Sequence, residues 1–142
     1  MALSSTDQGL TPPGMVALVD DEVQIAQALK ALLSFKGMAA SVHESAESLL
    51  AALTLRDGHL WLSESDGTTT RLGAVVLDLN LPGMNGADLA AELLRRRPQL
   101  PIVMITAALD EKLLARVRAM QGVTLLSKPF TLESLEQALQ AA

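Results

Sequence analysis

Apolar residues along the chain fall into short unbroken runs, and these runs alternate with longer segments in which apolar residues recur at helical spacing. Runs without polar alternation are typical of strands covered on both faces, as in a parallel sheet. They predict strands over residues 15–19, 38–43, 74–78, 102–106 and 124–127, of which the second is the weakest.

The segments of helical spacing predict a helix after each strand. Ser45 and Thr131 are suitable N-cap residues, Gly37 suits a left-handed C-cap, and Pro98 stops the helix before it. The predicted helices span residues 22–36, 46–55, 86–96, 110–120 and 132–141. Because parallel strands need crossover helices, these repeats predict an α/β fold with a doubly wound, five-stranded parallel sheet, (βα)5.

The length of 142 residues fits one domain with a single core. Residues 1–14, rich in Ser, Thr, Gly and Pro, predict a flexible lead-in, and residues 15–142 form the predicted domain. Residues 56–72 are polar around an apolar island that includes Trp61, and they predict an irregular insertion. We expect Trp61 to cover local apolar surface, with contact to a partner as the alternative.

The composition limits which classes of partner and which kinds of site are expected. Sixteen acidic and eleven basic residues give a formal net charge of −5, which opposes nucleic-acid binding by this segment. The absence of cysteine excludes disulfides, thiolate metal sites and a cysteine nucleophile. The first fourteen residues lack the features of a signal peptide, and no apolar run reaches the ~18 residues that a membrane span needs. We therefore expect a cytoplasmic chain that does not enter a membrane.

Polar residues end four of the predicted strands. The first strand is followed by Asp20 and Asp21, the third ends in Asp78, the fourth in Thr106, and Lys128 follows the fifth. In open parallel sheets the ligand crevice lies beyond the carboxyl ends of the strands. Each residue alone has an ordinary structural explanation, but their meeting at one sheet edge indicates a site.

The chemistry of that site follows from its charges. Two like charges ~4 Å apart cost ~4 kcal/mol at an effective dielectric of ~20, so gathered carboxylates need a cation. Oxygen ligands without a nearby His or Cys favour Mg²⁺ or Mn²⁺ over zinc. With a lysine as a point charge and a hydroxyl as a donor, the site suits a phosphoryl group on a carboxylate, and an aspartyl nucleophile is an established device for such transfer.

Four motifs in order resemble the receiver domain of two-component response regulators: LVDDE at 18–22, LDLNLPGMNG at 77–86, MITA at 104–107 and SKPF at 127–130. The resemblance covers nearly all of residues 15–141. It implies the flavodoxin-like strand order 2-1-3-4-5 and a signalling module rather than an enzyme. It further implies that Asp78 takes a phosphoryl group from a sensor histidine kinase or a phosphotransfer protein and that this switches the conformation toward an output domain or partner.

The resemblance also assigns roles to the strand-end residues. The carboxylates of Asp20, Asp21 and Asp78 and the backbone carbonyl of Asn80 would hold Mg²⁺.

Two further residues act on the phosphoryl group by the same resemblance. Lys128 would bind the phosphoryl oxygens, Thr106 would turn toward the group after transfer, and the Lys128–Pro129 bond would be cis. The family usually places Tyr or Phe three residues before the lysine, where this chain has Leu125. An aromatic switch therefore cannot operate there, and signalling would use a different rearrangement of the face formed by the fourth helix, fifth strand and fifth helix. Two copies of the chain pairing through that face, and a monomer, are the two alternatives for the oligomeric state.

Two other function classes are alternatives, but the motifs that they require are placed differently or absent in this chain. A phosphohydrolase of the haloacid-dehalogenase type also uses an Asp, Mg²⁺ and a lysine, but it places the nucleophile after the first strand in a DxD pattern. A flavodoxin-like nucleotide binder would need a glycine-rich phosphate loop after the first strand, which this chain lacks. Outside the site, we expect His43, His59 and the Arg95–Arg97 run to lie at the surface.

Overall fold

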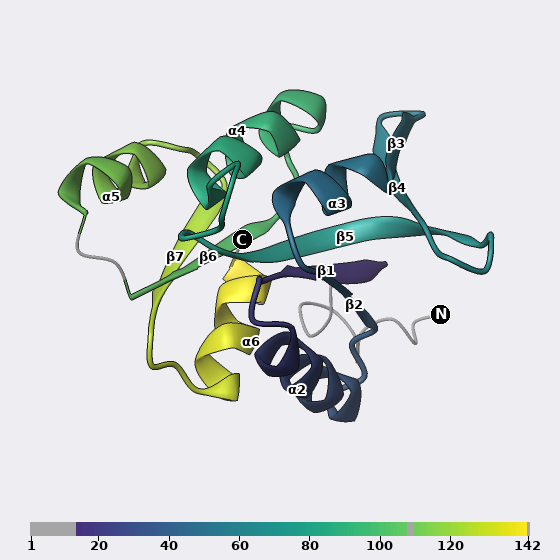
Figure 1. The fold of residues 1–142 in the computed structure, drawn as a ribbon, viewed down its shortest axis with the longest axis horizontal. Coiled ribbons are helices and arrows are strands. Elements are labelled where there is room, and N and C mark those ends of the chain that lie inside the picture. The colour runs from purple at the N-terminus through teal and green to yellow at the C-terminus, as the bar shows by residue number, and fades with distance from the viewer. Residues whose placement is uncertain (1–13, 108–109, 142) are drawn as a thin grey trace.

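A computed structural model describes residues 14–107 and 110–141, which form a sheet with helices on both of its faces (Figure 1). The predicted lead-in lies outside the described residues except for Gly14. In chain order the elements are β1 Met15–Val19, α2 Val23–Phe35, β2 Ala40–His43, α3 Ala46–Ala51, β3 Leu53–Arg56, β4 His59–Ser63, β5 Thr69–Asp78, α4 Gly86–Arg96, β6 Ile102–Thr106, α5 Glu111–Arg118, β7 Val123–Ser127 and α6 Leu132–Ala141.

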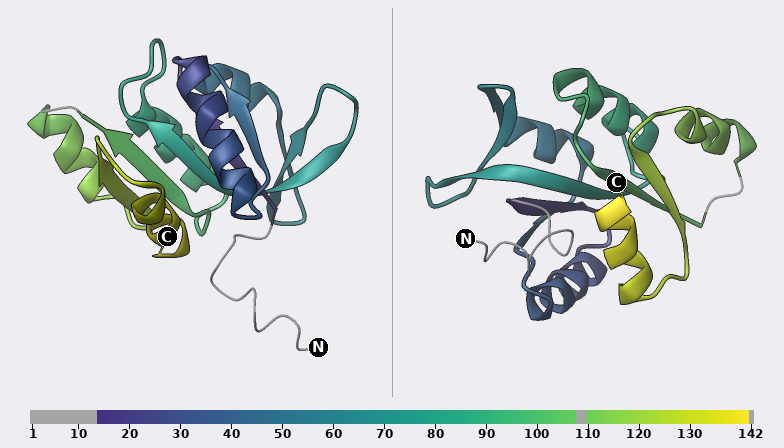
Figure 2. Two further views of the ribbon diagram at one scale, coloured as in Figure 1. Left: turned by 90° about the horizontal axis from the view of Figure 1, so that it is seen from below. Right: turned by 180° about the vertical axis from the view of Figure 1, so that it is seen from behind.

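The parallel part of the sheet has the predicted arrangement. The strands β2, β1, β5, β6 and β7 lie side by side in that order, and each neighbouring pair is parallel. This is the order 2-1-3-4-5 once β3 and β4 are set aside. The helices α3, α4 and α5 cover one face, and α2 and α6 cover the other, as two opposite views show (Figures 1 and 2). The doubly wound α/β fold is therefore confirmed.

The predicted irregular insertion is wrong: this region is a β-hairpin that enlarges the sheet to seven strands. The preceding helix α3 ends at Ala51, and β3 begins at Leu53, so the helix is shorter than predicted. Asp57 and Gly58 both have positive φ, at 56° and 76°, as a two-residue type I′ turn requires. The alternating apolar residues on each side of this Asp-Gly turn are a hairpin signal that outweighs the helical spacing of 46–55.

The hairpin joins the sheet through the long strand β5. The first residues of β5 pair antiparallel with β4, and its second half pairs parallel with β1 and β6. The register between β5 and β1 shifts between Met15 and Val16, where Leu72 and Ala74 are the successive partners. Gly73 is thus an extra residue, and this bulge places Leu72 and Ala74 in the cores on opposite faces of the sheet.

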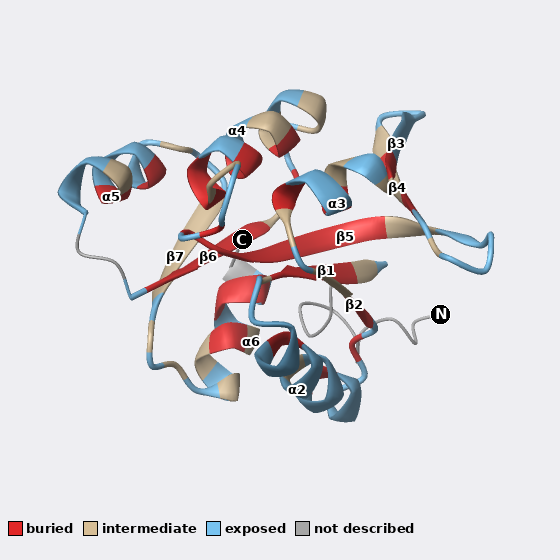
Figure 3. Cartoon of the chain, in the orientation of Figure 1, coloured by how far each residue is buried: buried red, intermediate tan, exposed pale blue. Residues whose placement is uncertain are grey.

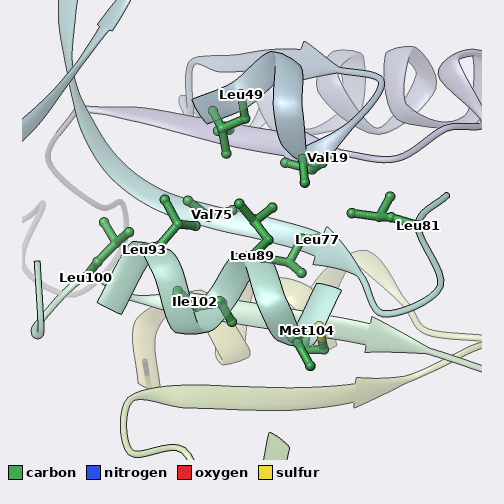
Figure 4. Packing of buried hydrophobic residues seen from close by; sticks show 14 of the residues in the cluster. Val19, Leu49, Val75, Leu77, Leu81, Leu89, Leu93, Leu100, Ile102 and Met104 are labelled. Carbon is green, nitrogen blue, oxygen red and sulfur yellow. The ribbon is translucent and has the colours of Figure 1, made fainter. Parts of the chain in front are cut away.

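Two apolar cores lie on the two faces of the sheet, and the central strands β1, β5 and β6 are buried over most of their length (Figure 3). In the larger core, Leu89 and Leu93 of α4 pack against Val75 and Leu77 of β5 (Figure 4). In the smaller core, Leu33 of α2 lies in one cluster with residues of β1, β5, β6 and α6. Among the described helices, none has both the length and the apolar character that crossing a membrane requires.

Candidate functional site

Asp78 is the last residue of β5 and is almost fully buried, with 7% of its surface exposed. The Nζ atom of Lys128 donates a hydrogen bond to its Oδ2 atom at 2.7 Å. The backbone N–H of Asn80 donates to its Oδ1 atom at 2.8 Å. Both carboxylate oxygens therefore have a donor, and the ammonium compensates the charge at a position where burial alone would disfavour it.

The chain turns at this point because backbone contacts hold the strand and the next helix together. The N–H of Leu79 donates to the carbonyl of Ile105, and the N–H of Gly86 donates to the carbonyl of Leu79. A Cβ atom on Gly86 would lie 2.5 Å from the backbone oxygen of Asp78, so only glycine fits there. Asn85 caps α4 by accepting a hydrogen bond from the N–H of Asp88 at 2.9 Å.

Lys128 reaches Asp78 on the central strand from the edge of the parallel sheet, since it follows β7, which is separated from β5 by β6. Its backbone N–H donates to the carbonyl of Thr106 at 2.9 Å, which extends the β6–β7 ladder to this residue. The Lys128–Pro129 bond is cis, as the resemblance implied. The hydrogen bond to Asp78, above all, raises the pKa of Lys128, so the side chain is an ammonium at neutral pH.

Asp20 follows β1 and lines a small cavity of about 40 Å³ together with Asp78 and Lys128. Its Oδ1 atom accepts a hydrogen bond from the N–H of Glu22 at 2.9 Å. Burial raises the pKa of Asp20, the Glu22 hydrogen bond opposes this, and the charge of Asp78 raises it further. Asp20 and Asp78 are therefore two carboxylates close enough for their charges to interact, and the charge of Lys128 partly offsets this at Asp20.

Thr106 ends β6 and is buried, with 3% of its surface exposed. In register it lies opposite Ser127, one residue before Lys128. Thr106, Leu125 and Lys128 line a second cavity of about 260 Å³, next to α5. Leu125 is half-buried and packs against the larger core. Lys128 thus borders two cavities, one that it shares with Asp78 and one that it shares with Thr106.

The residues present fit a hard cation in their chemistry, since Asp20 and Asp78 offer carboxylate oxygens and the predicted set contains no His or Cys. The predicted ligands do not all line the same cavity. Asp21 is exposed and does not line the cavity of Asp20 and Asp78. Across residues 14–107 and 110–141, no three His, Cys, Asp or Glu side chains are grouped so that they could hold a metal ion. The metal role of Asp20, Asp21, Asp78 and the Asn80 carbonyl stays a prediction.

One contact at the site was missed by the sequence reasoning. The Oε2 atom of Glu47, in the first turn of α3, accepts a hydrogen bond from the N–H of Met84 at 3.1 Å. Gly83 has a φ of 72°, and a Cβ atom there would lie 2.9 Å from the same carboxylate oxygen. Glu47 thereby ties α3 to the loop that follows Asp78. The two partners are 37 residues apart, and no local pattern pairs them.

The other polar residues singled out in the sequence lie away from this cavity. Arg95 and Arg96 both pair with Glu92, at 2.6 and 2.7 Å, and these hydrogen bonds lower the pKa of Glu92 to about 2. A ring nitrogen of His43 shares a hydrogen bond of 2.8 Å with the hydroxyl of Ser41, and burial lowers the pKa of the ring. His43 and His59 are half-buried rather than freely exposed.

Comparisons with known proteins place this geometry in context. A family model described as the response regulator receiver domain matches residues 16–140. The transcriptional regulatory protein FixJ of Rhizobium meliloti (strain 1021) is 28% identical over 127 residues, which are 89% of this chain and 55% of the relative. Nodulation protein W of Bradyrhizobium diazoefficiens is 32% identical over 130 residues, which are 90% of this chain and 50% of the relative. The chain spans about half the length of these curated relatives.

A solved structure shares the fold. The response regulator receiver protein from Pseudomonas putida superposes with a TM-score of 0.74 at 23% identity, and the match covers 92% of this chain and 98% of that one.

Proposed function

The chain belongs to the response regulator receiver domain family, and from this membership we propose that Asp78 accepts a phosphoryl group from a histidine kinase or a phosphotransfer protein. The observation that carries the proposal is the buried Asp78 carboxylate at the end of β5, held by Lys128 at 2.7 Å beside Asp20. Receiver domains are signalling modules, and the proposed activity is self-phosphorylation at this aspartate rather than turnover of a small-molecule substrate.

In the proposed step, an oxygen of Asp78 forms a bond to phosphorus while the P–N bond to the donor histidine breaks, and the imidazole leaves with the electron pair. Phosphoryl transfer passes through a loose transition state with charge on the equatorial oxygens, so positioning and charge compensation supply most of the catalysis. Lys128 is in place to move its ammonium from the carboxylate to a phosphoryl oxygen. A bound Mg²⁺ would add charge neutralisation between the carboxylates and the phosphoryl oxygens.

The switch is proposed to involve Thr106 and Lys128 together. If Lys128 turns toward a phosphoryl group, its hydrogen bond to Asp78 changes, and the Thr106 cavity on its other side is free to close. Leu125 lines that cavity, so an apolar side chain repacks where the family usually rotates an aromatic ring. The two conformations differ in the surface of α5, β7 and α6, which we propose as the surface read by an output domain, a partner or a second copy of the chain.

The setting proposed for this transfer is the cytoplasm. FixJ is named a transcriptional regulatory protein and is about twice as long as the matched region. The output controlled by this chain is therefore a separate question from the chemistry at Asp78. No observation favours the haloacid-dehalogenase-type alternative, because Asp78 ends the central strand β5 rather than the first strand.

The test is to incubate the protein with Mg²⁺ and a small phosphodonor and to measure intact mass. We expect one added phosphoryl group in the native protein and none in Asp78→Asn, which keeps the size of the side chain. Chelation of the metal should abolish the adduct. An adduct of undiminished yield in Asp78→Asn would overturn the assignment of the acceptor, and labelling that persists with chelator would overturn the metal role.

A matched control separates acceptor chemistry from surface charge. Asp110 likewise accepts a hydrogen bond from a backbone N–H two residues ahead, that of Lys112, and another from that of Leu113, but it is exposed and caps α5. Asp110→Asn should label like the native protein. Lys128→Gln should fold and gain the phosphoryl group more slowly than the native protein, as intact mass measured against time shows.

A further inference from the structure

The hairpin and the adjoining start of β5 carry two arginines and the single tryptophan of the chain on one face, far from the proposed phosphorylation site. Trp61 lies directly opposite Thr54 on β3 and opposite Arg71 on β5, while Arg56 lies opposite His59. Because side chains alternate along a strand, these residues share one face, and the leucines of the hairpin share the other. We call the set Arg56, His59, Trp61 and Arg71 the arginine face.

Trp61 holds Arg56 in place. The guanidinium carbon of Arg56 lies 4.7 Å from the centre of the Trp61 ring, and the Nε1 atom of Trp61 donates a hydrogen bond to the backbone carbonyl of Arg56 at 3.3 Å. The expectation that Trp61 covers local apolar surface stays a prediction, since the ring lies on the face opposite the hairpin leucines and stacks against Arg56. A guanidinium already held over a ring loses little freedom when it binds an anion.

The arginines of this face have no acidic partner within the described part of the chain. All ion pairs found there involve Lys36, Arg95, Arg96, Arg116 or Lys128 instead. Burial and the charges of Arg71 and Arg97 lower the pKa of His59, and only Asp57 opposes them. Arg97 reaches the rim of the face, where it lines a cavity of about 360 Å³ with His59 and the Asp57–Gly58 turn.

The guanidiniums of this face lack carboxylate partners although the chain as a whole is acidic, with a formal net charge of −5. Guanidinium forks bind carboxylates in two-pronged pairs, and the stacked Arg56 is pre-organised for this. A nucleic acid would meet the repulsion of the whole acidic chain, whereas a short acidic peptide segment meets mainly the local charge, because salt screens charges beyond about 10 Å.

We propose that the arginine face is a docking site for an acidic segment of a partner protein, whose carboxylates pair with Arg56 and Arg71 and, at the rim, with Arg97. This inference is independent of the proposed phosphorylation. Arg71 and Asp78 lie at opposite ends of β5, about 23 Å apart at the usual rise of a strand.

Trp61 is the only tryptophan, so its fluorescence reports on this face directly. The experiment titrates the full chain with a labelled synthetic peptide of alternating Glu and Ser and follows both Trp61 emission and peptide anisotropy. We expect saturable binding that weakens with added salt. A peptide of alternating Gln and Ser should not bind. Loss of one charge-assisted pair should weaken binding roughly tenfold in Arg56→Gln and in Arg71→Gln.

Arg95→Gln is the matched control, because Arg95 is equally cationic and, like Arg56, exposed, but pairs with Glu92 on α4. It should bind the acidic peptide like the native chain, and Arg71→Lys should retain more binding than Arg71→Gln. Unchanged circular dichroism and thermal midpoint in each variant exclude a folding defect. The proposal is overturned if the Glu peptide does not bind, if the Gln peptide binds equally, if Arg95→Gln loses as much as Arg71→Gln, or if a labelled single-stranded oligonucleotide binds more tightly than the peptide.

Discussion

The carboxyl edge of the parallel sheet and the hairpin at the other end of β5 differ in whether their charged side chains are paired within the chain. At the edge, Asp78 is buried and paired with Lys128, and Asp20 lies beside them. On the hairpin and the adjoining start of β5, Arg56 and Arg71 have no carboxylate partner among the described residues. A charge held in the interior has to be compensated within the chain, whereas a charge at the surface is solvated and remains available to a partner. We propose that the first region carries the chemistry and that the second serves recognition.

The largest expected difference between the two regions is in how much their leucines contribute to the free energy of unfolding. Leu89 of α4 is fully buried against β5, the strand that carries Asp78, whereas Leu55 on the hairpin is 53% exposed. We expect Leu89→Ala to lower the free energy of unfolding by about 2–5 kcal/mol and Leu55→Ala by about 0.5 kcal/mol or less. Chemical denaturation measures both. Equal losses would show that the hairpin is as integral to the core as α4.

Glycines give the next comparison. A Cβ atom on Gly86 would meet the backbone oxygen of Asp78 at 2.5 Å, whereas a Cβ atom on Gly58 meets nothing within 4 Å. Gly86→Ala should destabilise the protein by up to about 3 kcal/mol because backbone has to move. Gly58→Ala should cost about 1 kcal/mol, from its left-handed conformation alone. Thermal denaturation tests the order, and a larger loss in Gly58→Ala would contradict it.

A smaller effect of opposite sign is expected at Asp20. Its pKa is raised in the folded chain, mainly by burial, so its ionised form is disfavoured there. This destabilisation is absent below the ordinary pKa of aspartate and grows as the pH rises through the raised value. Asp20→Asn should therefore increase the free energy of unfolding near neutral pH by less than about 1 kcal/mol and change nothing at low pH. A variant that is less stable at neutral pH would refute this account.

The smallest effect is expected for the paired arginines of α4. The hydrogen bonds from Arg95 and Arg96 lower the pKa of Glu92 to about 2, so their stabilisation is present above the ordinary pKa of glutamate and is lost as the pH falls toward about 2. Glu92→Gln should lower the thermal midpoint slightly at neutral pH, and native and variant midpoints should converge in acid. A gap that persists in acid would mean that Glu92 acts through packing rather than charge.

Much of the fold could be predicted because its elements depend on local patterns. The bounds of β1, β6, α4 and α6 match the predicted ranges. Ser45 accepts from the N–H of Ser48, and Thr131 accepts from the N–H of Ser134, so both predicted caps are confirmed. The hairpin is the part of the fold that differs from the prediction, because the helical spacing of residues 46–55 continues through Leu55 and overlaps the local alternation beside the Asp-Gly turn.

What the sequence by itself determined is the order of strands and helices and the residue type that ends each strand, since apolar runs and caps act within a few residues of chain. Only the tertiary structure decided which of those ends meet. It joined Asp78 to Lys128 across 50 residues, placed Asp20 beside them, left Asp21 exposed, and tied Met84 to Glu47. It also placed Arg71 opposite Trp61, because the pairing of β4 with β5 depends on strand register and not on local pattern.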